Sequence, residues 1–243
     1  MSRVVAVIPA RMGSTRFPGK ALHPFGGHPL LYYVWRQVSK AVSVDQVLVA
    51  TDSPLIQSAA EEFGAEVVMT SRKHRTGTDR VAEAVEGITA DVVINIQGDT
   101  FGLNPSLLDR VIGSMKTDRS ISFATLARPI SDPRERDNPN TVKLVVSAEK
   151  NALWFSRHPI PYVQQSKGKK GARLTHLAHV GVYFFRRKAL KEFAGWPRTT
   201  SEKAESLEQL RILEHHRKVR VFVTRANTIS IDTSSDLKKI KRL

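Results

Sequence analysis

Residues 4–20 read VVAVIPARMGSTRFPGK, an apolar run that leads directly into a loop rich in glycine and positive charge. The run is interrupted by Arg11 and is much shorter than the ~18 apolar residues of a membrane span. It also lacks the longer apolar region and small-residue cleavage site of a signal peptide. The stretch therefore predicts a buried β-strand over residues 3–9, followed at once by a loop.

The composition of this loop indicates an anion site. Its glycines leave backbone N–H groups accessible, and Arg16 and Lys20 supply positive charge. A Walker loop does not fit, because five residues separate Gly13 from Gly19 and Ala21 follows Lys20 in place of serine or threonine. The dinucleotide fingerprint G-x-G-x-x-G is absent as well. The loop is therefore predicted to bind an anion by another design.

Apolar runs and helical patterns alternate through the first half of the chain. The runs are continuous rather than alternating, which is typical of a parallel sheet covered by helices on both faces. The predicted strands are 3–9, 46–51, 66–70, 91–97 and 121–127, and the predicted helices are 29–40, 54–63, 79–86 and 105–115. This order predicts an α/β fold with a mostly parallel, doubly wound central sheet.

The pattern changes after residue 128, where a polar, proline-punctuated connector occupies residues 128–140. Strands with less helix between them follow. The predicted strands are 141–147, 152–156, 179–186, 219–224 and 228–232, and the predicted helices are 202–216 and 234–243. We expect a smaller, mixed second lobe.

The segments that follow the strands nominate a site, because ligands of such sheets bind beyond the carboxyl ends of the strands. The first strand is followed by ARMGSTRFPGK, the third by SRKHRTGTDR and the fourth by GD. Two basic loops and one carboxylate at one sheet edge suit a polyanion with a divalent metal. The arrangement predicts a nucleoside triphosphate with Mg²⁺.

The 243-residue chain carries a formal net charge of +15 and no cysteine. The absence of cysteine excludes disulfides and thiolate metal sites, and we expect a soluble, cytoplasmic protein. The charge suits nucleic acid, a membrane surface or a small anionic substrate. The basic stretches 167–173 and 238–242 do not interleave aromatic residues with their cations, as a single-strand platform does, and are interpreted as solvated surface.

Eight segments resemble the motifs of one enzyme family, in their usual order. They are IPARMGSTRFPGK, ATD, TSRKHRTGTDR, NIQGD, FSRHPIP, HVGVY, ESLEQLR and IDT. Over essentially its whole length the chain resembles the 3-deoxy-manno-octulosonate cytidylyltransferases, or CMP-Kdo synthetases. The resemblance implies a Rossmann-like nucleotidyltransferase fold. It also implies transfer of CMP from CTP to Kdo, the sugar acid of lipopolysaccharide biosynthesis, with release of pyrophosphate.

The resemblance further implies one nucleotidyltransferase domain over residues 1–243. Within it, residues 1–128 are expected to bind the nucleotide, and residues 129–243 the acceptor and a second subunit. CTP and an acidic sugar are the implied ligands, and a homodimer is the implied assembly. Neither nucleic acid nor a membrane is expected as a partner.

The resemblance assigns the catalytic roles to Lys20, Arg16 and Asp99, and the ligation of Mg²⁺ to Asp99 and Asp232. For both aspartates a turn or helix-cap role stays open on the sequence alone. The residues implied to bind the nucleotide are Ala10, Arg11, Gly13, Ser14, Thr15, Arg16, Lys20, Ser71, Gly77, Asp79, Arg80 and Gln97.

The residues implied to bind the acceptor are Thr100, Arg157, His179, Tyr183, Glu205 and Gln209. The planar fork of Arg157 suits a substrate carboxylate. Glu205 and Gln209 lie four residues apart, so on the predicted helix they share one face and both meet sugar hydroxyls. A surface pair for these two residues and an interior position for His179 stay open as alternatives.

One segment departs from the family pattern. The chain reads QGDTFG at residues 97–102, where the family usually reads QGDEP. The acceptor therefore stays open among Kdo, 8-amino-Kdo, another ulosonic acid and a phosphonate, whereas the nucleotide half of the site is unaffected. The other classes considered are a basic nucleic-acid-binding protein, a dinucleotide-dependent oxidoreductase and a non-catalytic family member.

Overall fold

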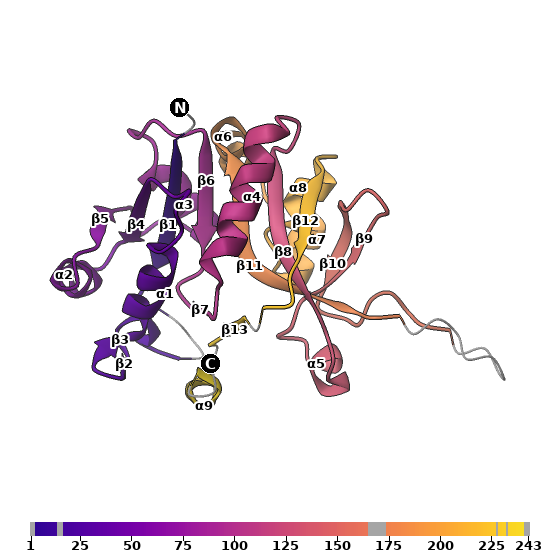
Figure 1. The fold of residues 1–243 in the computed structure, drawn as a ribbon, viewed down its shortest axis with the longest axis horizontal. Helices are drawn as coiled ribbons and strands as arrows, with labels where there is room; N and C mark the ends of the chain where they lie inside the picture. Colours follow the sequence, from indigo (N-terminus) through magenta and orange to yellow (C-terminus); the bar gives the residue numbers. More distant parts are fainter. Residues whose placement is uncertain (1–2, 14–16, 165–173, 227, 232, 241–243) are drawn as a thin grey trace. The chain divides into compact units, whose positions relative to one another are not determined.

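The computed structural model describes residues 3–13, 17–164, 174–226, 228–231 and 233–240 (Figure 1). The chain folds into two compact units. The first unit comprises Met1–Ser122, Gly181–Gly195 and Ala226–Leu243, and the second comprises Phe123–Val180 and Trp196–Arg225. Each unit is therefore built from segments that are not contiguous in the sequence.

The first unit is organised around a parallel sheet. At its centre, β1 (Val4–Ala10) pairs in parallel with β4 (Gln46–Thr51) and β6 (Val92–Ile96), and β4 pairs in parallel with β5 (Glu66–Met69). On the far side of β6, β11 (Leu177–Arg186) pairs antiparallel. Residues 4–8 have no exposed surface, which explains why this strand is apolar on both faces. The predicted parallel sheet is confirmed.

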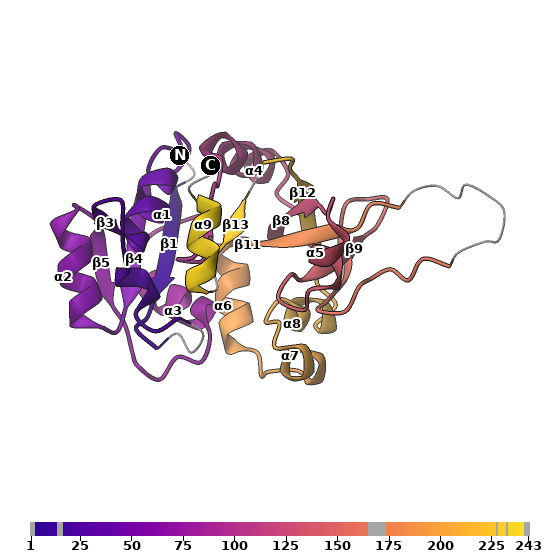
Figure 2. The same ribbon diagram turned by 90° about the horizontal axis from the view of Figure 1, so that it is seen from below.

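Helices cover both faces of this sheet (Figures 1 and 2). On one face lie α1 (Leu30–Val38) and α4 (Pro105–Thr117), and on the other lie α3 (Gly77–Ala84) and α6 (Arg187–Gly195); α2 (Pro54–Glu62) packs beside β4 and β5. The face of α1 that is buried carries Leu30, Leu31, Val34 and Val38, at helical spacing. In the described part of the chain, no helix is both long and apolar enough to cross a membrane.

Short elements complete the first unit. They are the 3₁₀ turns Lys20–Leu22 and Ser234–Asp236, the hairpin of β2 (Pro24–Phe25) and β3 (His28–Pro29), the antiparallel pair of β7 (Thr100–Phe101) and β13 (Ile229–Ser230), and α9 (Leu237–Ile240). The pairing of β7 with β13 brings residues from the end of the chain beside the end of β6.

The second unit has the mixed pairing predicted for the smaller lobe. Its β9 (Lys143–Val146) pairs antiparallel with β10 (Ala152–Ser156) and with the first residues of β11, whereas β8 (Phe123–Pro129) and β12 (Val219–Val223) pair in parallel. Its helices are α5 (Pro133–Asp137), α7 (Thr200–Glu205) and α8 (Leu210–Glu214).

The single helix predicted over residues 202–216 is wrong. The chain forms α7 and α8 with a break at Ser206, whose φ of 51° is left-handed. Glu205 ends the first helix and Gln209 caps the second, so these two residues do not share one helix face. The helices α5 and α6 were not predicted. Helix α5 is short and has no buried residue, whereas α6 buries Ala189, Leu190 and Phe193 at helical spacing, a pattern that could have predicted it.

Candidate functional site

The first loop is closed by a backbone hydrogen bond from Gly19 N to the carbonyl of Met12, at 3.3 Å. Gly19 has φ +66°, a conformation that favours glycine, and it leads directly into the 3₁₀ turn that begins with Lys20. Arg11 and Gly13 are exposed, and Ala10 at the end of β1 is buried. The predicted site residues Ser14, Thr15 and Arg16 lie outside the described residues.

Two of the predicted catalytic residues meet directly. Lys20 Nζ lies 2.5 Å from Asp99 Oδ2 and donates a second hydrogen bond to the carbonyl of Ile231, at 2.8 Å. The backbone N–H of Ile231 in turn donates to the carbonyl of Asp99 at 3.0 Å. Three distant parts of the chain thus hold one cation and one carboxylate at the carboxyl end of the parallel sheet.

The chemistry of Asp99 fits a divalent cation. One carboxylate oxygen pairs with Lys20, while Oδ1 is buried and has no hydrogen-bond partner among the described residues. An anionic oxygen without a donor is a ligand that Mg²⁺ prefers, and Mg²⁺ takes few protein ligands when phosphates and water supply the rest. The described residues contain no cluster of three or more histidine, aspartate or glutamate side chains that forms a metal cage. The second predicted ligand, Asp232, lies outside the described residues.

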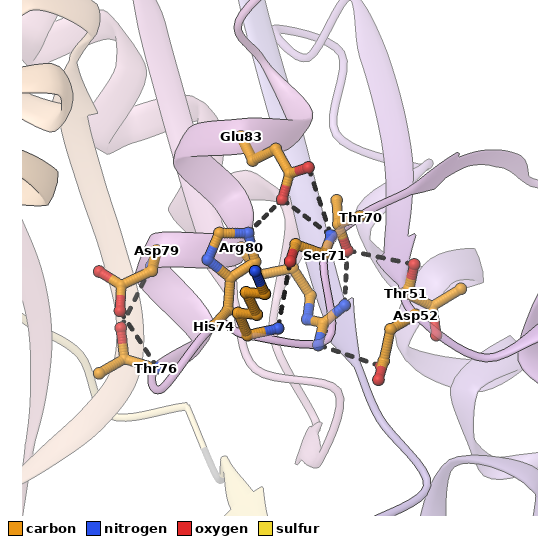
Figure 3. Close-up of polar contacts among 10 residues, drawn as sticks. Thr51, Asp52, Thr70, Ser71, His74, Thr76, Asp79, Arg80 and Glu83 are labelled. Atoms are coloured by element: carbon orange, nitrogen blue, oxygen red, sulfur yellow. Dashed lines mark hydrogen bonds and ion pairs between the residues drawn. The ribbon is translucent and has the colours of Figure 1, made fainter.

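The loop after β5 is fixed at both ends (Figure 3). At its start, Thr70 donates through its backbone N–H and its hydroxyl to the carbonyl of Thr51, at 2.8 and 3.1 Å. At its end, Asp79 and Thr76 form a reciprocal capping box at the start of α3, with distances of 3.1 and 3.2 Å. Asp79 therefore has a structural role at this helix terminus.

Arg80 joins three elements of this region. Its guanidinium is 3.0 Å from Asp52 Oδ1 and donates to the hydroxyl of Thr70, and the residue is only 5% exposed (Figure 3). Because both partners lie at the ends of neighbouring strands, Arg80 connects α3 to β4 and β5. Asp52 lies in the ATD segment but was not among the predicted site residues.

Gly77, at the start of α3, lies against the end of β1, where an added Cβ would come within 3.3 Å of Pro9.

The remaining predicted residues of the first unit differ in exposure. Gln97 is exposed and lies over Gly181, where an added Cβ would be 3.2 Å from its amide carbon. Tyr183 is 5% exposed, and Thr100 is 4% exposed within the β7–β13 pair. The Thr100 side chain is therefore buried.

In the second unit, Arg157 and Glu205 are brought together. The Glu205 carboxylate accepts from the Ser156 hydroxyl at 2.6 Å and from the Arg157 backbone N–H at 2.9 Å. The Arg157 guanidinium donates to the carbonyls of Glu205 at 2.7 Å and Pro139 at 2.9 Å. Buried Lys143 donates to the Arg157 carbonyl, and burial lowers the pKa of Lys143. Arg157 thereby contributes to ending α7 at Glu205.

The two other predicted acceptor residues of this unit differ in exposure, since Gln209 is buried and His179 is partly exposed. Gln209 is 2% exposed. The His179 ring has Nε2 at 2.8 Å from the Thr125 hydroxyl and packs edge-on against Phe155. Burial lowers the pKa of His179 to about 3, so the imidazole is neutral near pH 7.

Replacing His179 by glutamine is expected to make the stability less sensitive to acid. The unfolded chain binds a proton at this residue near pH 6.5, whereas the folded chain does not until about pH 3, so the parent loses stability as the pH falls through this window. The variant should lose about 2 kcal/mol less than the parent between pH 7 and 5. Urea unfolding at both pH values measures this, with the exposed His28→Gln as control. Equal losses in parent and His179→Gln would contradict it.

The chain matches the family model described as cytidylyltransferase over residues 5–220. It is 41% identical to the 3-deoxy-manno-octulosonate cytidylyltransferase of Geobacter sulfurreducens, with 98% of this chain and 97% of the relative covered. It is 42% identical to the protein of the same name from Bdellovibrio bacteriovorus, with 99% and 97% covered. A solved structure of CMP:2-keto-3-deoxy-manno-octonic acid synthetase complexed with CTP superposes with a TM-score of 0.90 at 38% identity, with 99% of this chain and 98% of that chain covered.

Proposed function

Since this chain belongs to the 3-deoxy-manno-octulosonate cytidylyltransferases, we propose that it forms CMP-Kdo from CTP and Kdo and releases pyrophosphate. In this reaction the anomeric hydroxyl oxygen of Kdo bonds to the α-phosphorus of CTP. The bond from that phosphorus to the oxygen bridging to the β-phosphate breaks, and the hydroxyl proton is released. The observation that carries the proposal is the Lys20–Asp99 pair at the carboxyl edge of the parallel sheet, in a chain related over its whole length to these enzymes.

Lys20 is proposed to stabilise negative charge on the phosphates. Charge builds up on the leaving pyrophosphate during transfer, and a fixed cation lowers the free energy of that state. The Ile231 carbonyl and the Asp99 carboxylate hold the ammonium in one position before the nucleotide binds. Such preorganisation reduces the cost of ordering the side chain in the transition state.

Asp99 is the residue proposed to hold Mg²⁺, through the oxygen that does not pair with Lys20, with Asp232 as a second ligand. When bound, Mg²⁺ would neutralise phosphate charge and lower the pKa of the attacking hydroxyl. We propose residues 1–128 for binding of the nucleotide and residues 129–243 for binding of the acceptor. Within the second portion, Arg157 and Glu205 are the proposed contacts to the sugar acid.

We further propose a homodimer located in the cytoplasm. The second unit exposes apolar side chains on its strands, with Leu153 57%, Trp154 37% and Val223 45% exposed. Exposed apolar side chains on neighbouring elements support contact with a second copy of the chain. Light scattering of the purified protein tests this, and a monomeric mass at micromolar concentration would exclude the dimer.

The other acceptors and the nucleic-acid-binding class are not favoured. The QGDTFG segment had left 8-amino-Kdo or a phosphonate open as acceptors, but the curated relatives that match over 96–97% of their length are named for Kdo. The net charge of +15 suits a triphosphate and a sugar acid as well as it suits nucleic acid.

A pyrophosphate-release assay tests the function directly. CTP, UTP, ATP and GTP are each combined with Kdo, 8-amino-Kdo and a phosphonate, with Mg²⁺ and with excess chelator. We expect turnover with CTP and Kdo, little with the purine nucleotides, and loss of activity in chelator that added Mg²⁺ restores. Equal use of the four triphosphates would exclude a cytidylyltransferase. Preference for another acid would correct the acceptor alone.

A further inference from the structure

The loop from Ser71 to Thr76 concentrates positive charge between two fixed ends. Arg72, Lys73 and Arg75 are exposed, and their side chains form no ion pair with other described residues. Three cations so close together repel one another, which favours a spread and variable loop. The contacts of Thr70 and the capping box hold only its two ends. The residues between these ends have a further contact, made by a carboxylate on α3.

Glu83 on α3 supplies that interaction (Figure 3). Its carboxylate accepts from the Ser71 backbone N–H, at 3.0 and 3.3 Å from the two oxygens, and contacts His74 Nε2. The Ser71 hydroxyl accepts from the Lys73 backbone N–H at 3.1 Å, which extends the restraint along the loop. One carboxylate thus fixes the residues on both sides of Arg72 and Lys73.

The charge of Glu83 is suited to this role. The hydrogen bond with His74 is the largest of the effects that hold the pKa of Glu83 below its ordinary value, and the Ser71 N–H adds to it. Because this pKa is lowered, the stabilisation from the carboxylate is complete above its ordinary pKa and is lost only as the pH falls through the lowered one. Near pH 7 the side chain is an anion beside a cationic loop.

We propose that Glu83 is a positioning residue, which together with His74 holds residues 71–75 so that their cations meet the phosphates of CTP. This inference rests on the proposed function. A loop held in one conformation loses less conformational freedom when the ligand binds, and this raises the affinity. The effect should therefore fall on the binding of polyphosphate rather than on the bond-making step.

The fold of the first unit does not depend on this contact. Arg80, Asp52 and the capping box already connect α3 to the strands, and the side chain of Glu83 is 36% exposed. Because a partly exposed pair contributes about 1 kcal/mol or less to stability, removing the carboxylate is expected to leave the thermal midpoint nearly unchanged. A loss of affinity without a loss of stability separates positioning from a purely structural role.

The test compares Glu83→Ala, Glu83→Gln and Glu61→Ala with the parent. Glu61 is the matched control, because it is an exposed helical glutamate of the same unit that accepts from Gln57 at 2.9 Å. Calorimetry with CTP and with pyrophosphate should show a Kd raised about tenfold in Glu83→Ala. Glu83→Gln should show a smaller rise, because its amide oxygen still accepts the Ser71 N–H. Glu61→Ala should match the parent.

Kinetics and a double variant complete the test. KM for CTP should rise with kcat within about twofold, and His74→Ala in the Glu83→Ala background should add nothing further. An unchanged Kd in Glu83→Ala, or a fall in kcat together with a fall in thermal midpoint, would overturn the inference. A parent that binds CTP but releases no pyrophosphate with Kdo would instead overturn the proposed function. The two failures are thus distinguishable.

Discussion

Replacing Asp99 by asparagine is expected to lower kcat/KM by about 10²–10³-fold. Asparagine keeps the shape of the side chain and one oxygen, but it has no negative charge to hold a divalent cation against the attraction of its water shell. It also removes the charge 2.5 Å from Lys20, so the ammonium is left with the Ile231 carbonyl as its other described partner. Both the charge and the placement of the cation are therefore changed by one substitution.

The measurement is kcat/KM for CTP and for Kdo over a range of Mg²⁺ concentrations, together with direct binding of Mn²⁺ as a probe of the metal site. We expect a weaker apparent metal affinity in the variant, and activity that excess metal restores only in part. Asp109→Asn is a matched control, since Asp109 accepts one backbone N–H, from Ser43 at 2.8 Å, on a helix of the same unit. If Asp99→Asn retains activity within tenfold of the parent, Asp99 is not the proposed metal ligand.

Comparison with Lys20→Gln separates the two effects of Asp99→Asn. Lys20→Gln removes the cation and leaves the carboxylate. If Asp99 acts only by placing the ammonium, the double variant should be no worse than Lys20→Gln alone. If Asp99 also holds the metal, the double variant should be less active than either single variant.

Replacing Arg211 by alanine is expected to lower the free energy of unfolding by about 3–5 kcal/mol, because it leaves a buried carboxylate without its main partner. Arg211 and Glu202 are 2% and 1% exposed. The guanidinium meets the two carboxylate oxygens at 2.6 and 2.8 Å. This bidentate pair connects α7 to α8 across the break between them.

The pKa of Glu202 reflects two opposing effects, burial and its arginine partners. Burial acts to raise it, but the hydrogen bonds and charge of Arg211, with help from Arg198, outweigh burial and hold it below the ordinary value. The pair therefore stabilises the fold above the ordinary pKa of a glutamate. Its contribution is lost as the pH falls through the lowered pKa.

Urea unfolding at pH 7 measures this effect in Arg211→Ala, Arg211→Lys and Arg198→Ala. Arg198 also pairs with Glu202, at 3.1 Å, but its side chain is 36% exposed, so its removal should cost about 1 kcal/mol or less. Lysine at position 211 should be intermediate, since it cannot bond both oxygens in a planar fork. Equal losses of unfolding free energy for Arg211→Ala and Arg198→Ala would show that burial does not determine how much the Arg211–Glu202 pair stabilises the fold.

Much of the first unit could be predicted from the sequence, because its strands are continuously apolar and its loops follow their carboxyl ends. The same rule placed Lys20 and Asp99 at one edge of the sheet, and the structure places them in contact. The roles of all the predicted site residues stay predictions, and Ser14, Thr15, Arg16 and Asp232 lie outside the described residues. The partners of the predicted residues were harder to predict. Asp52 and Glu83 are ordinary carboxylates in the sequence, and their roles become clear only from their contacts with Arg80 and Ser71 in the structure.

The break at Ser206 could not be predicted, because the local sequence favours one helix and the interruption depends on distant residues. Arg157 binds the carbonyls at the end of α7 from 48 and 49 positions away. The burial of Thr100 and Gln209 could not be predicted either, because polar residues give no periodic signal of burial in the sequence. Tertiary contacts thus override local propensity at the break between α7 and α8 and at the predicted acceptor residues.

The Lys20–Ile231 contact has a consequence for how the protein is made. A ribosome delivers the chain from its amino end, so β1, β4, β5 and β6 emerge long before residue 231. Until then Lys20 has no carbonyl from the last segment to hold it, and β7 has no β13 to pair with. A nascent or prematurely terminated chain can therefore form the parallel strands and still lack the finished cation site. Residues 229–231 must therefore be synthesised before Lys20 and β7 have these partners, and products truncated before them lack the complete Lys20 contact set.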